Sequence, residues 1–76
     1  MTNYVRFFAI LREQTGIDSQ EVAADDLRNI QDLWSSLTKE PLDATTLIAI
    51  NKTYAGPKSL VKDGDEVAFF PPITGG

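Results

Sequence analysis

Apolar and polar residues alternate near both ends of the chain, and this pattern predicts that the first and last elements are strands. The first strand is expected over NYVRFFAI, Asn3 to Ile10, a run rich in β-branched and aromatic residues. Its alternation divides the side chains between two faces: Val5, Phe7 and Ala9 on one, and Tyr4, Arg6, Phe8 and Ile10 on the other. The last strand is expected over EVAFF, Glu66 to Phe70, with Val67 and Phe69 directed toward the core.

A helical period replaces this alternation in the middle of the chain. The segment NIQDLWSSL, Asn29 to Leu37, carries one apolar stripe at helical spacing: Ile30, Leu33, Trp34 and Leu37. Asn29 is a favourable N-cap for this helix. A shorter helix of one or two turns is expected over Leu11 to Gly16, with Gly16 as a left-handed C-cap.

The remaining segments predict short strands and turns. SQEVAA, Ser19 to Ala24, is expected to form a second strand with Val22 directed inward, in a hairpin with the first strand. TTLIAINKTYA, Thr45 to Ala55, is a β-rich run interrupted near Asn51-Lys52, and Asp63-Gly64 is a turn signal. This order predicts an α+β domain in which a mixed sheet packs on one main helix and the first and last strands are neighbours.

Composition removes several classes of function. The chain has 76 residues, enough for one small domain, and a formal net charge of -4. Its seven Lys and Arg are scattered among eleven acids and form no basic footprint, so nucleic acid is not an expected partner. Because the sequence has no Cys and no His, it excludes zinc sites of the usual kind and Cys–His or Ser–His–Asp nucleophiles. We therefore expect no metal site.

Nothing in the sequence indicates a membrane or secreted protein. No apolar run has the length of a transmembrane helix. The first residues, MTNYVRFFAI, lack a basic region followed by an apolar run and a small-residue cleavage site. We therefore expect a cytoplasmic protein with no membrane partner.

The stretch FFPPITGG, Phe69 to Gly76, begins with two apolar aromatic residues, continues with two conformationally restricted prolines and ends with two glycines. Pro71 and Pro72 cannot donate ladder hydrogen bonds, so strand pairing should stop there, and together they favour an extended segment. We therefore divide the chain into a domain, residues 1–70, and an extended tail, residues 71–76, which includes Thr74. Gly75 and Gly76 are slim enough to pass through a narrow channel.

The reactive group of such a tail is the terminal carboxylate of Gly76. A carboxylate reacts with nucleophiles only after it gains a leaving group, usually as a mixed anhydride with a nucleotide phosphate. The sequence has no phosphate-binding Gly-rich loop, and it has no His to act as a general base. We therefore expect the chain to be a substrate and carrier that another protein activates.

The sheet face away from the helix is expected to carry aromatic residues. If Val67 and Phe69 face the helix, then Phe70 faces away from it, as does Phe8 by the same alternation. Tyr54 is placed to join them. Two or three aromatic side chains on one open sheet face form a patch, and such patches usually mark a partner-binding surface.

Several segments resemble one known family. DGDEVAFFPPITGG, residues 63–76, is similar to the C-terminal signature of the small subunits of molybdopterin synthase, a family of ubiquitin-like sulfur carriers. The segments VRFFAILRE (5–13), EVAA (21–24) and LIAINKTY (47–54) are also similar to this family. The resemblance covers nearly the whole chain and is weakest over residues 25–46, where only the helix pattern agrees.

The resemblance implies a β-grasp fold and a chemistry for the tail. In this family an E1-like adenylating enzyme uses ATP to convert the terminal glycine, here Gly76, to an acyl-adenylate, and sulfur from a persulfide donor then gives a thiocarboxylate. The small subunit binds no cofactor of its own. The tail enters the large synthase subunit, within a heterotetramer, and its sulfur passes to cyclic pyranopterin monophosphate. The resemblance also assigns partner contacts to four residues: Phe8, Arg12, Tyr54 and Phe70.

Three other functions stay open. The related sulfur carrier of thiamine biosynthesis shares the fold and the chemistry, although its tail typically lacks the Pro-Pro pair. A ubiquitin-like protein modifier would join Gly76 to lysines of other proteins. A plain interaction module would never activate its tail, so it would keep its partner after removal of Gly76, whereas a carrier or a modifier would lose all activity.

Overall fold

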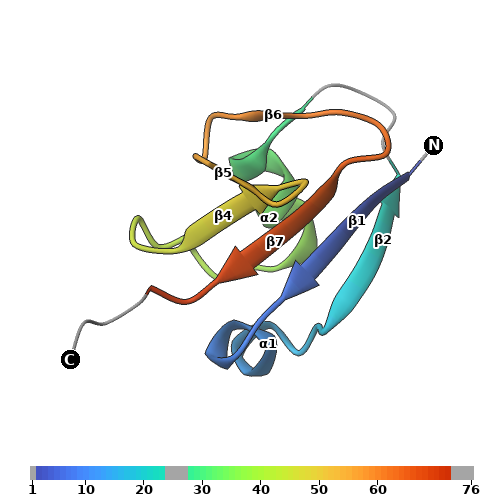
Figure 1. The fold of residues 1–76 in the computed structure, drawn as a ribbon. Coiled ribbons are helices and arrows are strands. Elements are labelled where there is room, and N and C mark those ends of the chain that lie inside the picture. The colour runs from blue at the N-terminus through green and yellow to red at the C-terminus, as the bar shows by residue number, and fades with distance from the viewer. Residues whose placement is uncertain (1, 24–27, 73–76) are drawn as a thin grey trace.

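The computed structural model describes residues 2–23 and 28–72. Two helices and seven strands form within these residues (Figure 1). Along the chain they are β1 (Thr2–Phe7), α1 (Ile10–Thr15), β2 (Ser19–Ala23), β3 (Arg28–Asn29), α2 (Ile30–Leu37), β4 (Leu47–Ile50), β5 (Thr53–Ala55), β6 (Leu60–Val61) and β7 (Glu66–Phe70).

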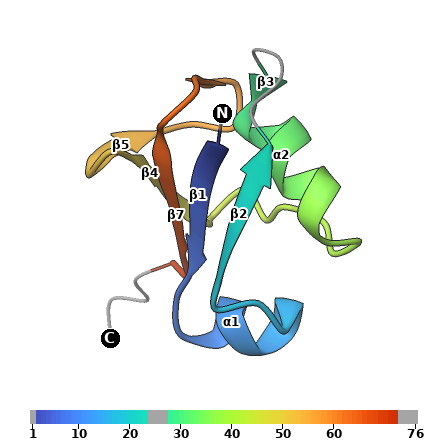
Figure 2. The ribbon, with the colours of Figure 1, turned by 90° about the vertical axis from the view of Figure 1, so that its right-hand side faces the viewer.

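Five of the strands form one mixed sheet in the order β2-β1-β7-β4-β5. β1 and β7 run parallel at its centre, and the other neighbouring pairs are antiparallel. Helix α2 covers one face of this sheet (Figure 2). The α+β class, the mixed sheet on one main helix and the pairing of the first and last strands are thus confirmed.

The core lies between the sheet and α2. Val5 and Phe7 of β1 lie opposite Val67 and Phe69 of β7, and all four side chains are buried. From the helix stripe, Ile30, Leu33 and Trp34 are buried against them, and Leu37 packs at the edge. Trp34 stands edge-on to Phe69, with ring centroids 4.9 Å apart. Its indole Nε1 donates a hydrogen bond to the carbonyl of Glu40 at 2.7 Å, so the polar atom of this buried ring is satisfied.

The first strand ends earlier than the alternation predicts. β1 stops at Phe7, so the expectation that Ala9 and Ile10 continue the strand to Ile10 is wrong. The backbone turns at Ala9, which has a φ of 53°, and Ile10 begins α1. The amide of Phe8 still donates to the carbonyl of Phe69, whereas the carbonyl of Phe8 accepts from Leu11, the start of the helical turn. Local hydrogen bonding therefore overrides the strand preference of Ile10.

The predicted caps and turns are confirmed. Gly16 ends α1 in the left-handed conformation, with a φ of 73°. The side chain of Asn29 accepts a hydrogen bond from the amide of Asp32 at 2.8 Å and caps α2. Asn51 and Lys52, both with positive φ, form the tight turn between β4 and β5. The second strand was expected to reach Ala24, which lies outside the described residues.

One short sheet was not predicted from the sequence. The sequence pattern gives no sign of the two-residue strands β3 and β6, which pair with each other beside the N-terminus of α2. Of the two helices in the described part of the chain, neither is long and apolar enough to cross a membrane.

Candidate functional site

The sheet face opposite α2 carries cross-strand rows of side chains. In the apolar row, Phe70 of β7 lies opposite Leu47 of β4. In the next row, Ala68 of β7 pairs with Arg6 of β1. Directly opposed residues share one face of a sheet. Along β1 and β7, this face therefore changes from a row that contains Arg6 to an apolar row that contains Phe70. The apolar row lies at the end of the sheet where β7 leads into Pro71.

An apolar hollow of about 300 Å³ lies at this end of the face. The residues that line it come from the end of β1, the start of β4, β5 and the end of β7: Phe8, Ala9, Leu47, Tyr54, Phe70 and Pro71. Phe8 and Phe70 are half-buried, while Tyr54 is 74% exposed. None of these six residues carries a carboxylate, an amine or a thiol, so the hollow is suited to hold apolar side chains of a partner rather than to perform chemistry.

Two of the three aromatic side chains of this hollow, Phe8 and Phe70, stack on each other. The rings of Phe8 and Phe70 are nearly parallel, at an interplanar angle of 11°, and their centroids are 4.6 Å apart. The guanidinium carbon of Arg6 lies 5.3 Å from the centroid of the Phe8 ring, within cation–π distance. Phe8 lies beside Phe70 because the parallel register of β1 and β7 continues past Phe7, and the amide of Phe8 donates to the carbonyl of Phe69.

The structure brings together most of the described residues that the sequence assigned to partner binding. Phe8, Tyr54, Phe70 and Pro71 share the apolar hollow. β7 ends at Phe70, so strand pairing stops at Pro71 as expected, and Pro72 is exposed. Thr74, Gly75 and Gly76 lie outside the described residues. Contact of these residues with a partner stays a prediction.

Arg12 does not line the apolar hollow. It lies on α1 and forms an ion pair with Asp18 at 3.6 Å, with 58% of its own side chain and 72% of that of Asp18 exposed. Such an exposed pair contributes little to stability, so Arg12 can leave Asp18 for a partner at small cost.

Three residues of this region were missed by the sequence reasoning. Leu47 and Ala9 line the hollow, and Arg6 covers the Phe8 ring. For Arg6 the signal was present, because it shares the alternation of Phe8. For Leu47 there was none, since its position opposite Phe70 depends on the register between β4 and β7.

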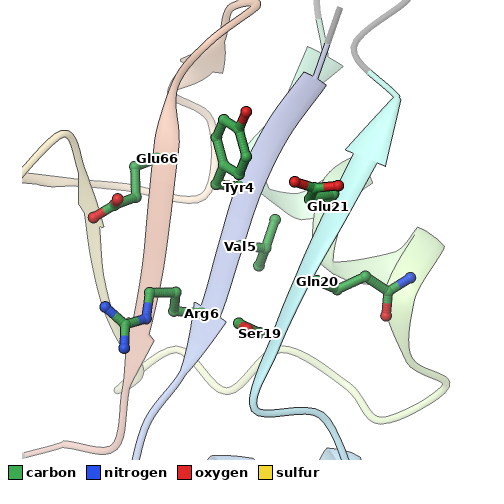
Figure 3. A pocket seen from close by; sticks show the side chains of 7 residues that line it. All are labelled: Tyr4, Val5, Arg6, Ser19, Gln20, Glu21 and Glu66. Atoms are coloured by element: carbon green, nitrogen blue, oxygen red, sulfur yellow. The ribbon is translucent and has the colours of Figure 1, made fainter.

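A second, polar hollow of about 440 Å³ lies at the other end of the same face, over β2, β1 and β7 (Figure 3). Its lining includes Tyr4, Arg6, Glu21 and Glu66. Arg6 lies between the two hollows, because it lines the polar hollow and its guanidinium lies over the ring of Phe8, which lines the apolar one.

Comparisons with known proteins agree with this architecture. The sequence model of the ThiS family matches residues 5–76. The molybdopterin synthase sulfur carrier subunit of Escherichia coli K12 is 41% identical over an alignment of 81 positions, covering 95% of this chain and 96% of that protein.

Two solved structures have the same fold. A candidate molybdopterin converting factor subunit 1 from Pyrococcus furiosus has a TM-score of 0.77 at 26% identity, covering 96% of this chain and 99% of that one. Small archaeal modifier protein 1 from Methanosarcina acetivorans has a TM-score of 0.75, also at 26% identity, covering 99% and 96%. With the mixed sheet and helix α2 on one of its faces, these matches confirm the predicted ubiquitin-like β-grasp fold.

Proposed function

Because the chain belongs to the ThiS family, we propose that it is the sulfur carrier subunit of a molybdopterin synthase. The observation that carries this proposal is the 41% identity to the Escherichia coli carrier subunit along 95% of the chain. The apolar hollow beside Pro71 supports it, because a carrier must present its tail and a docking surface together.

The chemistry takes place on Gly76. In an E1-like enzyme, the carboxylate displaces pyrophosphate from ATP and becomes an acyl-adenylate. The terminal sulfur of a persulfide then displaces AMP, and a second thiol cleaves the resulting acyl disulfide to leave a thiocarboxylate. In the synthase this sulfur passes to cyclic pyranopterin monophosphate. ATP is therefore a substrate of the activating enzyme, and the carrier binds no cofactor of its own.

The folded domain fixes the point at which the tail begins. β7 is paired on both sides, by β1 and by β4, up to Phe70, and Pro71 then lies against the apolar hollow. A partner that receives the tail must therefore approach the hollow as well. The aromatic stack of Phe8 and Phe70 gives it an apolar anchor, the type of contact that dominates interfaces.

The partners follow from this role. The large synthase subunit binds the tail and the apolar hollow in a heterotetramer of two small and two large subunits, and the E1-like enzyme uses the same hollow. Because one hollow serves both, the two partners bind in turn and not together. Both encounters take place in the cytoplasm.

Intact mass measurement tests the proposal. The chain is incubated with its host's E1-like enzyme, ATP and a sulfur donor, beside a control chain that lacks Gly76. We expect a mass gain equal to replacement of one oxygen by sulfur in the full chain and no gain in the control. If a related carrier gains sulfur under the same conditions and this chain does not, the proposal is wrong.

The protein-modifier function is a second candidate, supported by the fold shared with small archaeal modifier protein 1 at 26% identity. The same incubation distinguishes it when lysine-containing host proteins are added. A modifier would appear as covalent adducts that carry the whole chain, whereas a carrier would gain sulfur alone. A thiamine-pathway carrier would also gain sulfur but would not pass it to cyclic pyranopterin monophosphate.

A further inference from the structure

The guanidinium of Arg6 lies over an aromatic ring and not beside a carboxylate. Its central carbon is 5.3 Å from the centroid of the Phe8 ring. Within residues 2–23 and 28–72, the ion pair that forms joins Arg12 to Asp18. Glu21 lines the polar hollow together with Arg6, yet the Arg6 side chain extends across β7, away from Glu21 (Figure 3). The described residues therefore contact this guanidinium through the Phe8 ring and not through an ion pair.

Small side chains on the neighbouring strands leave space for Arg6 to lie in this way. Arg6 pairs with Ala68 of β7, and Ala68 pairs in turn with Ala49 of β4. Directly opposed residues share one face of a sheet, so both alanines lie on the same face as Arg6, and neither has side-chain atoms beyond Cβ. The aliphatic part of Arg6 therefore lies along the sheet while its charged end reaches the ring of Phe8.

The ring of Phe8 depends on such contacts, because Phe8 lies just beyond the last residue of β1. Its amide donates to the carbonyl of Phe69, and its carbonyl accepts from the amide of Leu11. These hydrogen bonds fix the backbone of Phe8 but not the side-chain torsions. The ring is half-buried, so its orientation is set by the side chains beside it, among them Phe70 at a centroid distance of 4.6 Å and Arg6.

We propose that Arg6 is a positioning residue of the apolar hollow: its guanidinium holds the Phe8 ring in the stack with Phe70, so that the docking surface is already formed in the free chain. The proposal rests on the proposed function, because the large synthase subunit is the partner that uses this surface. A side chain that is already ordered loses less conformational entropy on binding. Arg6 therefore raises the affinity of the hollow through Phe8, without a contact of its own to the partner.

A double-mutant cycle on binding of the purified large subunit tests whether Arg6 acts through Phe8. The four full-length chains are the wild type, Arg6→Gln, Phe8→Ala and the double variant. Lys39→Gln, at an exposed position after α2, is the matched control for the loss of one positive charge. We expect Arg6→Gln to bind about two- to fivefold more weakly than the wild type, as loss of an exposed cation–π contact predicts, and to have no further effect in the Phe8→Ala background. An equal loss in both backgrounds, an equal loss in Lys39→Gln, or wild-type affinity of Arg6→Gln would each overturn the proposal.

A measurement on the free chain separates this proposal from the proposed function. The ring current of Phe70 shifts the NMR resonances of the stacked Phe8 ring, so these resonances report the stack without any partner. We expect Arg6→Gln to move them toward the values of an unstacked ring while the resonances of the buried Phe69 ring stay in place, and we expect Lys39→Gln to move neither. Unchanged Phe8 resonances in Arg6→Gln would overturn the proposal whatever the binding result.

The two proposals fail in different ways. If the wild-type chain does not bind the large subunit but Arg6→Gln still moves the Phe8 resonances, the proposed function is contradicted and the positioning role of Arg6 in the free chain is supported. If the wild-type chain binds and gains sulfur but Arg6→Gln behaves like the wild type in both measurements, the positioning role is overturned and the carrier function is unaffected.

Discussion

Phe69 and Phe70 are adjacent in the sequence, yet replacing each by Ala should damage a different property of the protein. Phe69 is fully buried between Phe7 and Trp34, with ring centroids 5.3 Å and 4.9 Å away. Phe70 is half-buried on the opposite face, where it stacks on Phe8 in the apolar hollow. Phe69→Ala therefore tests the core, and Phe70→Ala tests the docking surface.

The magnitudes differ enough to be resolved. Truncation of a buried Phe costs about 3–5 kcal/mol, whereas loss of a half-buried stacked ring should cost roughly 1–2 kcal/mol. At about 0.05–0.15 kcal/mol per residue, the whole 76-residue chain has a stability of roughly 4–11 kcal/mol. With about 4–8 °C per kcal/mol for a domain of this size, Phe69→Ala should lower Tm by about 12–40 °C, and Phe70→Ala by roughly 4–16 °C.

Thermal and urea unfolding, followed by the fluorescence of Trp34, measure the stability of the core. Titration with the large synthase subunit, at a temperature where both variants are folded, measures binding at the docking surface. We expect Phe70→Ala to bind at least tenfold more weakly, as loss of an interface anchor of about 1.4 kcal/mol or more predicts. Equal destabilisation by the two substitutions, or unchanged binding by Phe70→Ala, would refute the assignment of the two faces.

Two further predictions concern the turns. Gly64 has a φ of 86° and open space where a Cβ would lie, so Gly64→Ala should cost about 1–2 kcal/mol through the backbone alone; Gly56→Ala, at a position without positive φ, is the matched control, and equal Tm values for the two variants would contradict the argument. The hydroxyl of Thr45, and then its backbone amide, donate to the exposed carboxylate of Asp43 and lower the pKa of Asp43. Thr45→Ala should therefore raise the pKa of Asp43 toward its ordinary value, as a side-chain NMR titration would show. The lowered pKa of Asp43 stabilises the fold at pH values above the ordinary pKa of an aspartate. This stabilisation is lost as the pH falls through the lowered pKa, so the variant should lose less stability on acidification. An unchanged Asp43 titration would contradict this assignment.

The sequence was sufficient for those parts of the fold that depend on local pattern. The alternation of Val67 and Phe69, the helical stripe of α2 and the caps at Asn29 and Gly16 are local signals, and the structure agrees with each. The end of β1 was misplaced because the turn at Ala9 depends on hydrogen bonds of Phe8 with both Phe69 and Leu11. The first of these partners is distant in the sequence, so no local pattern reports it.

The site was predictable only in part for the same reason. Phe8 and Phe70 could be placed on the open face by alternation, and the structure stacks them. Leu47 joins them only through the register of β4 against β7. Register is a property of the assembled sheet, which one sequence does not report residue by residue.

The most direct test of the carrier function follows the mass of the chain through one complete cycle. The chain is loaded with the E1-like enzyme, ATP and a sulfur donor, and the large subunit and cyclic pyranopterin monophosphate are then added. We predict that one oxygen is replaced by sulfur on loading and that the original mass returns as molybdopterin forms, with neither change in a chain lacking Gly76. A chain that never gains sulfur, or that keeps it in the presence of the large subunit and the precursor, would contradict the account.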